Sequence, residues 1–146
     1  MDVRAMNAEM TAKLIDAPAG APPEGGYALR VVETRGRRTG APRRVPLAVV
    51  AHEGGQYLVS PVRDRDWVEN LVATPECALL SGGRREDRRA DPAGGEEAAA
   101  VVAAYLAAMS VPWAIRAFPV PQDATPAQIL EQLPGMAVFR LSTVDS

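Results

Sequence analysis

Five stretches of the chain have the apolar content typical of β-strands, and a sixth, charged stretch is predicted as a strand from the glycine turn before it. They cover residues 27–34, 45–52, 56–60, 76–81, 84–90 and 136–141. Hairpin signals at residues 53–55 and 82–83 join two pairs of them, so we predict antiparallel pairing. Pro46 places the start of the second stretch at a sheet edge or a bulge, and the charged residues 84–90 are expected to form an exposed edge strand.

Apolar residues at helical spacing predict four helices among these strands. They cover residues 3–15, a segment around Trp67, residues 96–109 and residues 125–133. The apolar side of the second helix is predicted to carry Trp67, Val68, Leu71 and Val72, with Asp64 or Asp66 as its cap. Thr125 followed by Pro126 is a good cap and first residue for the last helix.

This order of elements predicts one α+β domain over residues 1–146, built on a small closed or partly closed barrel. Residues 1–16 form an N-terminal helix, residues 17–26 a Pro/Gly-rich loop, and residues 27–146 the barrel with its inserted helices. An all-parallel sheet is disfavoured because the connections before residue 60 are too short for crossover helices.

Positive charge is concentrated in one loop, although the whole chain of 146 residues has a net charge of -2. Six arginines lie between Arg30 and Arg44, and the glycines Gly36 and Gly40 permit a backbone with φ > 0. Convergent N–H groups and arginine forks suit a phosphate or carboxylate ligand. The alternative is a solvated, charged hairpin.

The small numbers of cysteine and histidine residues argue against several classes of function. The single cysteine, Cys77, lies in an apolar run and is predicted to be a buried, inert thiol. One histidine, His52, makes a multi-His metal site and a Cys/His hydrolase improbable, so we predict no metal. No run of about 20 apolar residues and no signal peptide is present, which predicts a soluble cytoplasmic protein without a transmembrane segment.

Four motifs together resemble the deazaflavin-dependent nitroreductase family. They are residues 31–47 with the loop Gly-Arg-Arg-Thr-Gly, the helix Asp-Trp-Val-Glu-Asn-Leu at residues 66–71, Thr-Pro-Glu at residues 74–76, and Val-Phe-Arg-Leu at residues 138–141. The resemblance runs from about Tyr27 to the end of the chain. It implies a split β-barrel and an oxidoreductase that uses coenzyme F420, a deazaflavin with an anionic phosphate and polyglutamate tail.

The resemblance also implies roles for individual residues. Arg37, Arg38, Thr39 and Gly40 would hold the coenzyme phosphate, Arg43 or Arg44 would reach its tail, and Pro46 continues the motif. Trp67 would lie near the deazaflavin ring, with core packing as the open alternative. Asn70 would fix the Trp67 helix or only brace it. Ser60 would lie near the reacting ring, although its connection to Trp67 is shorter than in the family.

The implied reaction is hydride transfer from reduced deazaflavin to a small acceptor such as a quinone, enone or nitroaromatic. Trp113 and Phe118 occupy the segment that lines the substrate site, and Ser60 or Tyr105 is a candidate proton donor or substrate-positioning group. Because the coenzyme carries the hydride, the protein needs few catalytic side chains.

Three other classes remain open at this stage. A flavin mononucleotide (FMN) enzyme could use the same barrel and arginines, and a non-catalytic ligand-binding protein would fit the shortened Ser60 to Trp67 connection. Nucleic-acid binding is the weakest, because the rest of the chain is acidic and no aromatic residues interleave the basic loop. The sequence does not specify the oligomeric state.

Overall fold

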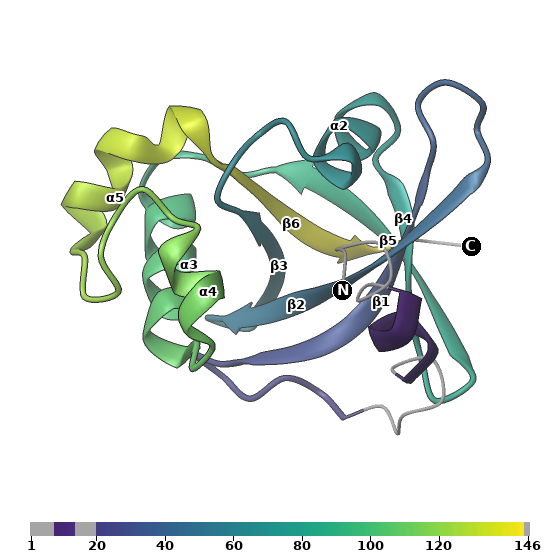
Figure 1. Cartoon of the computed structure of the whole chain (residues 1–146), viewed down its shortest axis with the longest axis horizontal. Helices are drawn as coiled ribbons and strands as arrows, with labels where there is room; N and C mark the ends of the chain where they lie inside the picture. The colour runs from purple at the N-terminus through teal and green to yellow at the C-terminus, as the bar shows by residue number, and fades with distance from the viewer. Residues whose placement is uncertain (1–7, 14–19, 145–146) are drawn as a thin grey trace.

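Six antiparallel strands form a closed barrel in the order β1-β2-β3-β6-β5-β4 (Figure 1). The computed structural model describes residues 8–13 and 20–144. The strands are β1 (Tyr27–Arg35), β2 (Pro42–His52), β3 (Gly55–Ser60), β4 (Glu76–Ser81), β5 (Arg84–Pro92) and β6 (Ala137–Thr143). With the helices that flank them, they confirm the predicted α+β barrel, and each predicted strand is present.

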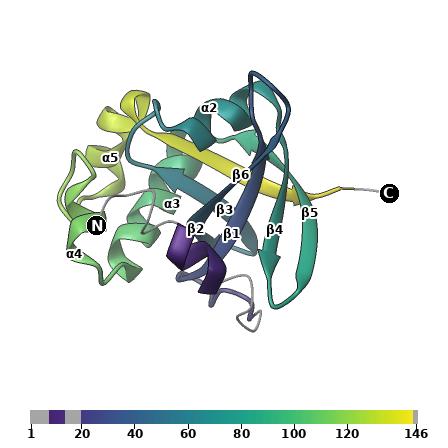
Figure 2. The ribbon, with the colours of Figure 1, turned by 45° about the vertical axis from the view of Figure 1, so that its right-hand side comes forward.

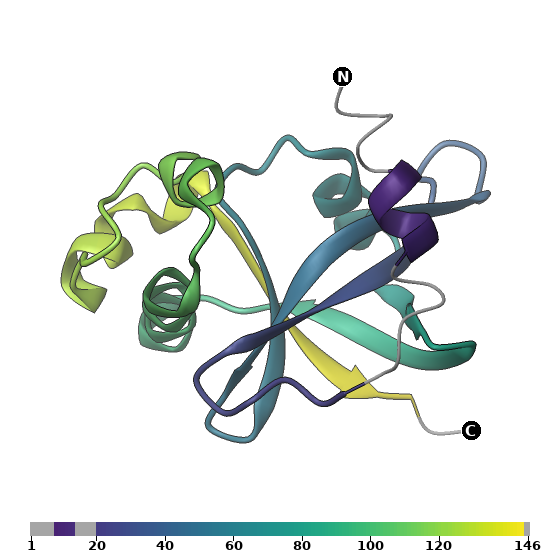
Figure 3. The ribbon, with the colours of Figure 1, turned by 60° about the horizontal axis from the view of Figure 1, so that its bottom comes forward.

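The helices gather at two places around the barrel. They are α2 (Asp66–Ala73), α3 (Gly95–Ala108), α4 (Pro112–Arg116), α5 (Pro126–Gln132) and the 3₁₀ turn η1 (Leu133–Gly135). Figures 1 and 3 show α3, α4 and α5 together on one side of the barrel, with α2 apart from them. Residues 8–13 are also helical, and the rest of the predicted N-terminal helix lies outside the described residues.

Two of these helices test the sequence reasoning directly. The cap predicted at Thr125 is confirmed, and it forms a full capping box: the Thr125 hydroxyl accepts from the Gln128 N–H while the Gln128 side chain accepts from the Thr125 N–H. The short helix α4 was not predicted. Pro112 was interpreted only as an interruption, whereas it occupies the first turn of α4, where its missing N–H is not needed.

The side chains of the strands alternate between the barrel interior and its outer face, where one group packs under the helices and a smaller separate cluster lies on β1 and β4. Val32 and Val49 point into the barrel, where they join Leu58, Phe139 and the buried side of α2. Val50 points outward and packs with the buried residues of α3 and α5. The barrel interior therefore fixes the position of α2, and its outer face fixes the position of the other helices.

The α2 helix differs from the prediction at its start and on its buried side. Arg65 is the N-cap and makes no side-chain capping bond, so the predicted caps Asp64 and Asp66 are wrong. Val72 was expected in the core but is 65% exposed, whereas Asn70 is buried at 3%. The reason is the packing direction: one side of α2 lies against the loop between β1 and β2, and Asn70 points there (Figure 2).

Strand β5 is not the edge strand that its charges suggested. It pairs with β4 on one side and with β6 on the other, which closes the barrel. Most of its side chains are exposed or half-buried, as the alternating charges require. The edge prediction failed because the second partner, β6, lies far away in the sequence.

The barrel wall has an opening along the first part of β2. Residues 42–50 of β2 pair with β1, but pairing with β3 begins only at Val50. Pro46, opposite Val31, therefore lies on a stretch with one paired side, as expected for a proline at a sheet edge. This opening borders a large cleft beside the β1–β2 loop.

Candidate functional site

A cleft of about 1520 Å³ lies between the β1–β2 loop, the first part of β2 and helix α2. Its volume exceeds the roughly 300–1,000 Å³ of ordinary small-molecule pockets, so an extended ligand has room. Figure 2 shows the loop and α2 side by side. The lining residues are Gly36, Arg37, Arg38, Thr39, Pro42 to Leu47, Asp64 to Trp67, Asn70 and Trp113.

The loop at one end of the cleft has a tight internal geometry. The N–H of Gly36 donates to the Ala41 carbonyl at 2.8 Å, and the N–H of Gly40 donates to the Gly36 carbonyl at 2.8 Å. Gly40 adopts φ = 75°, as its glycine predicted. Gly36 does not have positive φ. It is needed for space instead, since a Cβ there would lie 3.3 Å from the Ala41 oxygen.

Arg37 turns from the loop toward α2. Its Nη2 lies 3.3 Å from Asp66 Oδ1 and 3.0 Å from Glu69 Oε2. Its Nη1 donates to Asn70 Oδ1 at 3.0 Å, and its main-chain N–H donates to the same oxygen at 3.1 Å. The Asn70 amide in turn donates to Thr34 Oγ1 at 3.2 Å. The loop is therefore joined to both α2 and β1.

Arg43 and Arg44 point to opposite faces of β2. Both lie on the strand and not in the loop, because β2 begins at Pro42, earlier than the sequence indicated. Successive strand residues face opposite ways, and Val45 packs on the barrel interior beside Trp67, so Arg43 shares the face of the cleft. Thr34, opposite Arg43 in the β1–β2 register, also bonds to Asn70 on that face.

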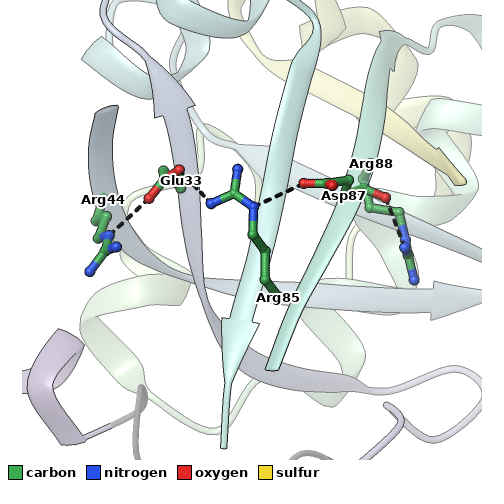
Figure 4. A network of polar contacts seen from close by, with 5 residues as sticks. All are labelled: Glu33, Arg44, Arg85, Asp87 and Arg88. Carbon is green, nitrogen blue, oxygen red and sulfur yellow. Dashed lines mark hydrogen bonds and ion pairs between the residues drawn. The ribbon is translucent and has the colours of Figure 1, made fainter. Parts of the chain in front are cut away.

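Arg44 is held on the other face by Glu33 (Figure 4). Its Nε lies 3.0 Å from Glu33 Oε2, while Arg85 Nη1 lies 2.8 Å from Glu33 Oε1 and Arg85 Nε lies 3.0 Å from Asp87. Glu33 is 8% exposed. The Arg85 guanidinium, helped by Arg44, holds the pKa of the Glu33 carboxyl below its ordinary value, although burial acts in the opposite direction.

Trp67 belongs to both the core and the cleft. It is 5% exposed and packs against Phe139, and it also forms part of the cleft wall. Its indole Nε1 is buried and has no hydrogen-bond acceptor in the described part of the chain. The core-packing interpretation of Trp67 is therefore correct. Because Trp67 also lines the cleft, its contact with the deazaflavin ring stays a prediction.

The structure separates the other expected site residues. Trp113, on α4, is 62% exposed and lines the cleft. Ser60 is fully buried and its hydroxyl donates to the Val62 carbonyl. Tyr105 and Phe118 pack together with ring centroids 5.3 Å apart in the outer core, where burial raises the pKa of the Tyr105 hydroxyl. Ser60, Tyr105 and Phe118 thus lie outside the lining of the cleft.

Sequence reasoning missed several residues of the site. Asp66 was considered only as a helix cap and Glu69 was given no role, yet both bind Arg37. Val45 and Leu47 form an apolar stretch of the wall. Val45 and Leu47 could have been found from the alternation of side chains along β2, which places every second residue from Arg43 on the cleft side.

Two further properties concern the whole described chain. Across residues 8–13 and 20–144, no helix combines the length and the apolar character that crossing a membrane requires. The same residues contain no group of three or more His, Cys, Asp or Glu side chains that could hold a metal ion.

A basic loop beside an apolar, tryptophan-lined cleft in an antiparallel barrel defines a binding protein for a ligand that is anionic at one end and flat and apolar at the other. The model of the F420H(2)-dependent quinone reductase family matches residues 3–132, and the chain belongs to that family. It is therefore an F420-dependent oxidoreductase, as the resemblance implied, and its coenzyme is the deazaflavin F420.

Solved structures support the fold. An F420-H2 dependent reductase, FDR-A, is 22% identical, with a TM-score of 0.50, covering 85% of this chain and 100% of its own. A domain-swapped dimer is 24% identical, with a TM-score of 0.50 and coverage of 78% and 79%. A heme binding protein from Mycobacterium smegmatis is 16% identical, with a TM-score of 0.53, and the match covers 79% of this chain but 46% of that protein. At these identities the likeness shows the fold alone. Comparison with curated proteins found no match.

The residues of the cleft fit this coenzyme chemically. Arginine forks and a glycine-shaped loop at one end suit an anionic tail, and the apolar wall at the other end suits a flat ring. Arg38, Arg43 and Thr39, which carry hydrogen-bond donors, line the cleft, and its volume of about 1520 Å³ has room for both parts.

Proposed function

We propose that the chain transfers a hydride from reduced F420 to a quinone in the cleft between the β1–β2 loop and α2. The observation that carries this proposal is the division of one cleft into a basic end and an apolar end. Its family is the F420H(2)-dependent quinone reductases, which supports a quinone as the acceptor class.

The basic end would bind the anionic part of the coenzyme. Arg38 and Arg43 lie there with Thr39, and the loop backbone is held by the hydrogen bonds from Gly36 to Ala41 and from Gly40 to Gly36. Charged hydrogen bonds from guanidinium groups to phosphate are about twice as strong as neutral ones. This end therefore supplies most of the affinity and sets the direction of the coenzyme in the cleft.

The apolar end would position the reacting rings. Val45, Leu47 and Trp67 form a wall that excludes water, and Trp113 is exposed at the cleft where a flat acceptor can stack on it. When bound, the reduced coenzyme supplies the hydride. The task of these side chains is to hold the acceptor carbon or oxygen near it and keep the site dry.

The proton that completes quinone reduction would come from solvent at the Trp113 side. The hydroxyl groups of Ser60 and Tyr105 lie outside the cleft lining, and the Ser60 hydroxyl is already bonded to a carbonyl. A hydride and one proton convert a quinone into a hydroquinone, so no acidic side chain is required at the reacting atoms.

Two measurements test the proposal. Fluorescence titration with F420 and separately with FMN should give tight binding to F420 only. Anaerobic mixing of the protein with reduced F420 and a panel of quinones, enones and nitroaromatics should restore oxidised coenzyme absorbance fastest with quinones. Trp113→Ala should raise the KM for the quinone, and Trp113→Phe should restore it because a flat ring is retained. Tight F420 binding without quinone-dependent reoxidation would refute the quinone assignment.

A further inference from the structure

We propose that Arg37 and Asn70 form a clamp that positions the basic loop, and that the coenzyme's anionic groups are bound by Arg38 and Arg43. This inference rests on the proposed binding of F420 in the cleft. The sequence motif does not distinguish Arg37 from Arg38 and Arg43, whereas this inference gives them different roles. Arg37 and Asn70 position the loop and are not the residues that bind the ligand.

The guanidinium of Arg37 already has protein partners on both of its terminal nitrogens. Nη1 donates to Asn70 Oδ1, and Nη2 lies within 3.3 Å of Asp66 and within 3.0 Å of Glu69. Its side chain is 30% exposed. These three contacts leave only part of the five N–H groups of Arg37 for a phosphate, and the two carboxylates beside it would repel an anion, so Arg37 gains little by turning to the coenzyme.

Asn70 is fixed by three hydrogen bonds and is almost fully buried. Its Oδ1 accepts from the main chain and the side chain of Arg37, at 3.1 and 3.0 Å. Its Nδ2 donates to Thr34 Oγ1 at 3.2 Å. Asn70 is among the lining residues of the cleft, but both polar atoms of its side chain are occupied at 3% exposure, so its hydrogen bonds join the loop to β1 and are not free for the ligand.

Arg38 and Arg43 differ from Arg37 in this respect. Within residues 8–13 and 20–144, neither guanidinium has a hydrogen bond or an ion pair to the protein, and both residues line the cleft. Arg44 lines it as well, but its Nε is engaged by Glu33 on the other face of β2. The unengaged charge at the cleft therefore belongs to Arg38 and Arg43.

The clamp also connects the two ends of the cleft. Asn70 and Trp67 lie on the same short helix α2, one turn apart, and Trp67 forms part of the apolar wall. Because the loop is bonded to Asn70, the distance between the anion-binding arginines and the ring wall is set by a rigid element and not by a free hairpin. A loose loop would lower affinity without removing any ligand contact.

A double-mutant cycle in coenzyme affinity tests the clamp. Asn70→Ala and Arg37→Gln should each raise the F420 Kd by about 10-fold, and the double variant should again raise it by about 10-fold and not 100-fold, because both changes release the same loop. Arg43→Gln combined with Asn70→Ala should instead be closer to additive, because Arg43 lies on strand β2 and not in the loop. The exposed Arg84 lies outside the cleft lining, so Arg84→Gln is a control with the same charge loss and normal affinity. Additive effects of Arg37→Gln and Asn70→Ala, or normal affinity in both, would overturn the clamp.

Salt dependence separates a contact from a clamp. Arg38→Gln and Arg43→Gln remove a charge that faces the ligand, so the fall of affinity with added salt should become less steep. Asn70→Ala removes no charge and should leave that slope unchanged. A flatter slope for Asn70→Ala, or an unchanged slope for both arginine variants, contradicts the assignment.

A measurement without coenzyme keeps this inference distinct from the proposed function. The Arg37 amide donates to Asn70 and should be protected from hydrogen exchange in the free protein. Asn70→Ala should lower this protection at least about 10-fold relative to the core amide of Val32, and Asn70→Asp, which keeps the acceptor, should preserve it. Unchanged protection in Asn70→Ala refutes the clamp even if F420 binds. Lost protection without any F420 binding by the unaltered protein supports the clamp and refutes the proposed site.

Discussion

Trp67 and Phe139 meet inside the barrel with their ring centroids 6.0 Å apart and their planes at 56°. The same Trp67 forms part of the cleft wall, and its indole Nε1 has no acceptor in the described chain. Trp67 therefore packs in the core that holds α2 and also forms part of the cleft surface on which a ring can lie.

Replacement of Trp67 should change both stability and coenzyme binding. Trp67→Phe leaves a gap beside Phe139 and should lower the free energy of unfolding by roughly 1–2 kcal/mol in urea titrations. It should also alter the fluorescence of bound F420, because the cleft wall changes shape. A change in stability alone would leave core packing as the complete role of Trp67.

The neighbours Arg43 and Arg44 should give opposite results, because they point to opposite faces of β2. Arg43→Ala should weaken F420 binding by about 10-fold or more while the free energy of unfolding stays within about 0.5 kcal/mol. Arg44→Ala removes one partner of the buried Glu33 and should lower the free energy of unfolding by about 1–2 kcal/mol, with a smaller effect on affinity. Equal effects of the two substitutions on affinity would show that both reach the ligand.

Glu33 should make stability depend on pH in the acid range. Arg85 and Arg44 hold the pKa of its carboxyl below the ordinary value of 4.5, so its stabilising contribution is complete above about pH 4.5 and is lost as the pH falls through the lowered pKa. Glu33→Gln should lower the free energy of unfolding by about 1.5–3 kcal/mol at pH 7 and by less at pH 3. Urea titrations at the two pH values measure this difference. A constant difference between the two pH values would contradict it.

Cys77 should be inert in the folded protein. It is 7% exposed, and burial raises the pKa of its thiol to about 11, so on the order of one thiol in a thousand is ionised at pH 8. A thiol-specific colorimetric reagent should react slowly in buffer and rapidly in denaturant. Fast reaction in buffer would show that the strand β4 opens readily.

The elements that sequence reasoning found depend on short-range signals. The glycine pair between β4 and β5 and the Thr125 cap are both readable within a few residues, and both are present. Failures came from long-range contacts. The closing pair of β5 and β6 joins distant segments, so the charged β5 looked like an edge.

The functional site also depends on long-range contacts that short-range sequence signals do not predict. The sequence motif gathers Arg37, Arg38, Arg43 and Arg44 in one loop, and it cannot show that α2 supplies acids for one and β1 an acid for another. The start of β2 at Pro42 decides which face Arg43 and Arg44 take, and a shift of one residue would exchange them. The positions of Ser60, Tyr105 and Phe118 outside the cleft likewise follow from packing.

The first part of β2 pairs with only one neighbouring strand, and we call this discontinuity in the hydrogen bonding of the barrel wall its seam. From Pro42 to Val49 this strand is bonded to β1 alone, so it can separate from the wall without breaking the β3, β5 and β6 ladders. Its amides should therefore exchange faster than those of the rest of the sheet in the empty protein. A ligand that contacts Arg43 and Leu47 would close this seam, and occupancy of the cleft could then be followed through the backbone of a single strand.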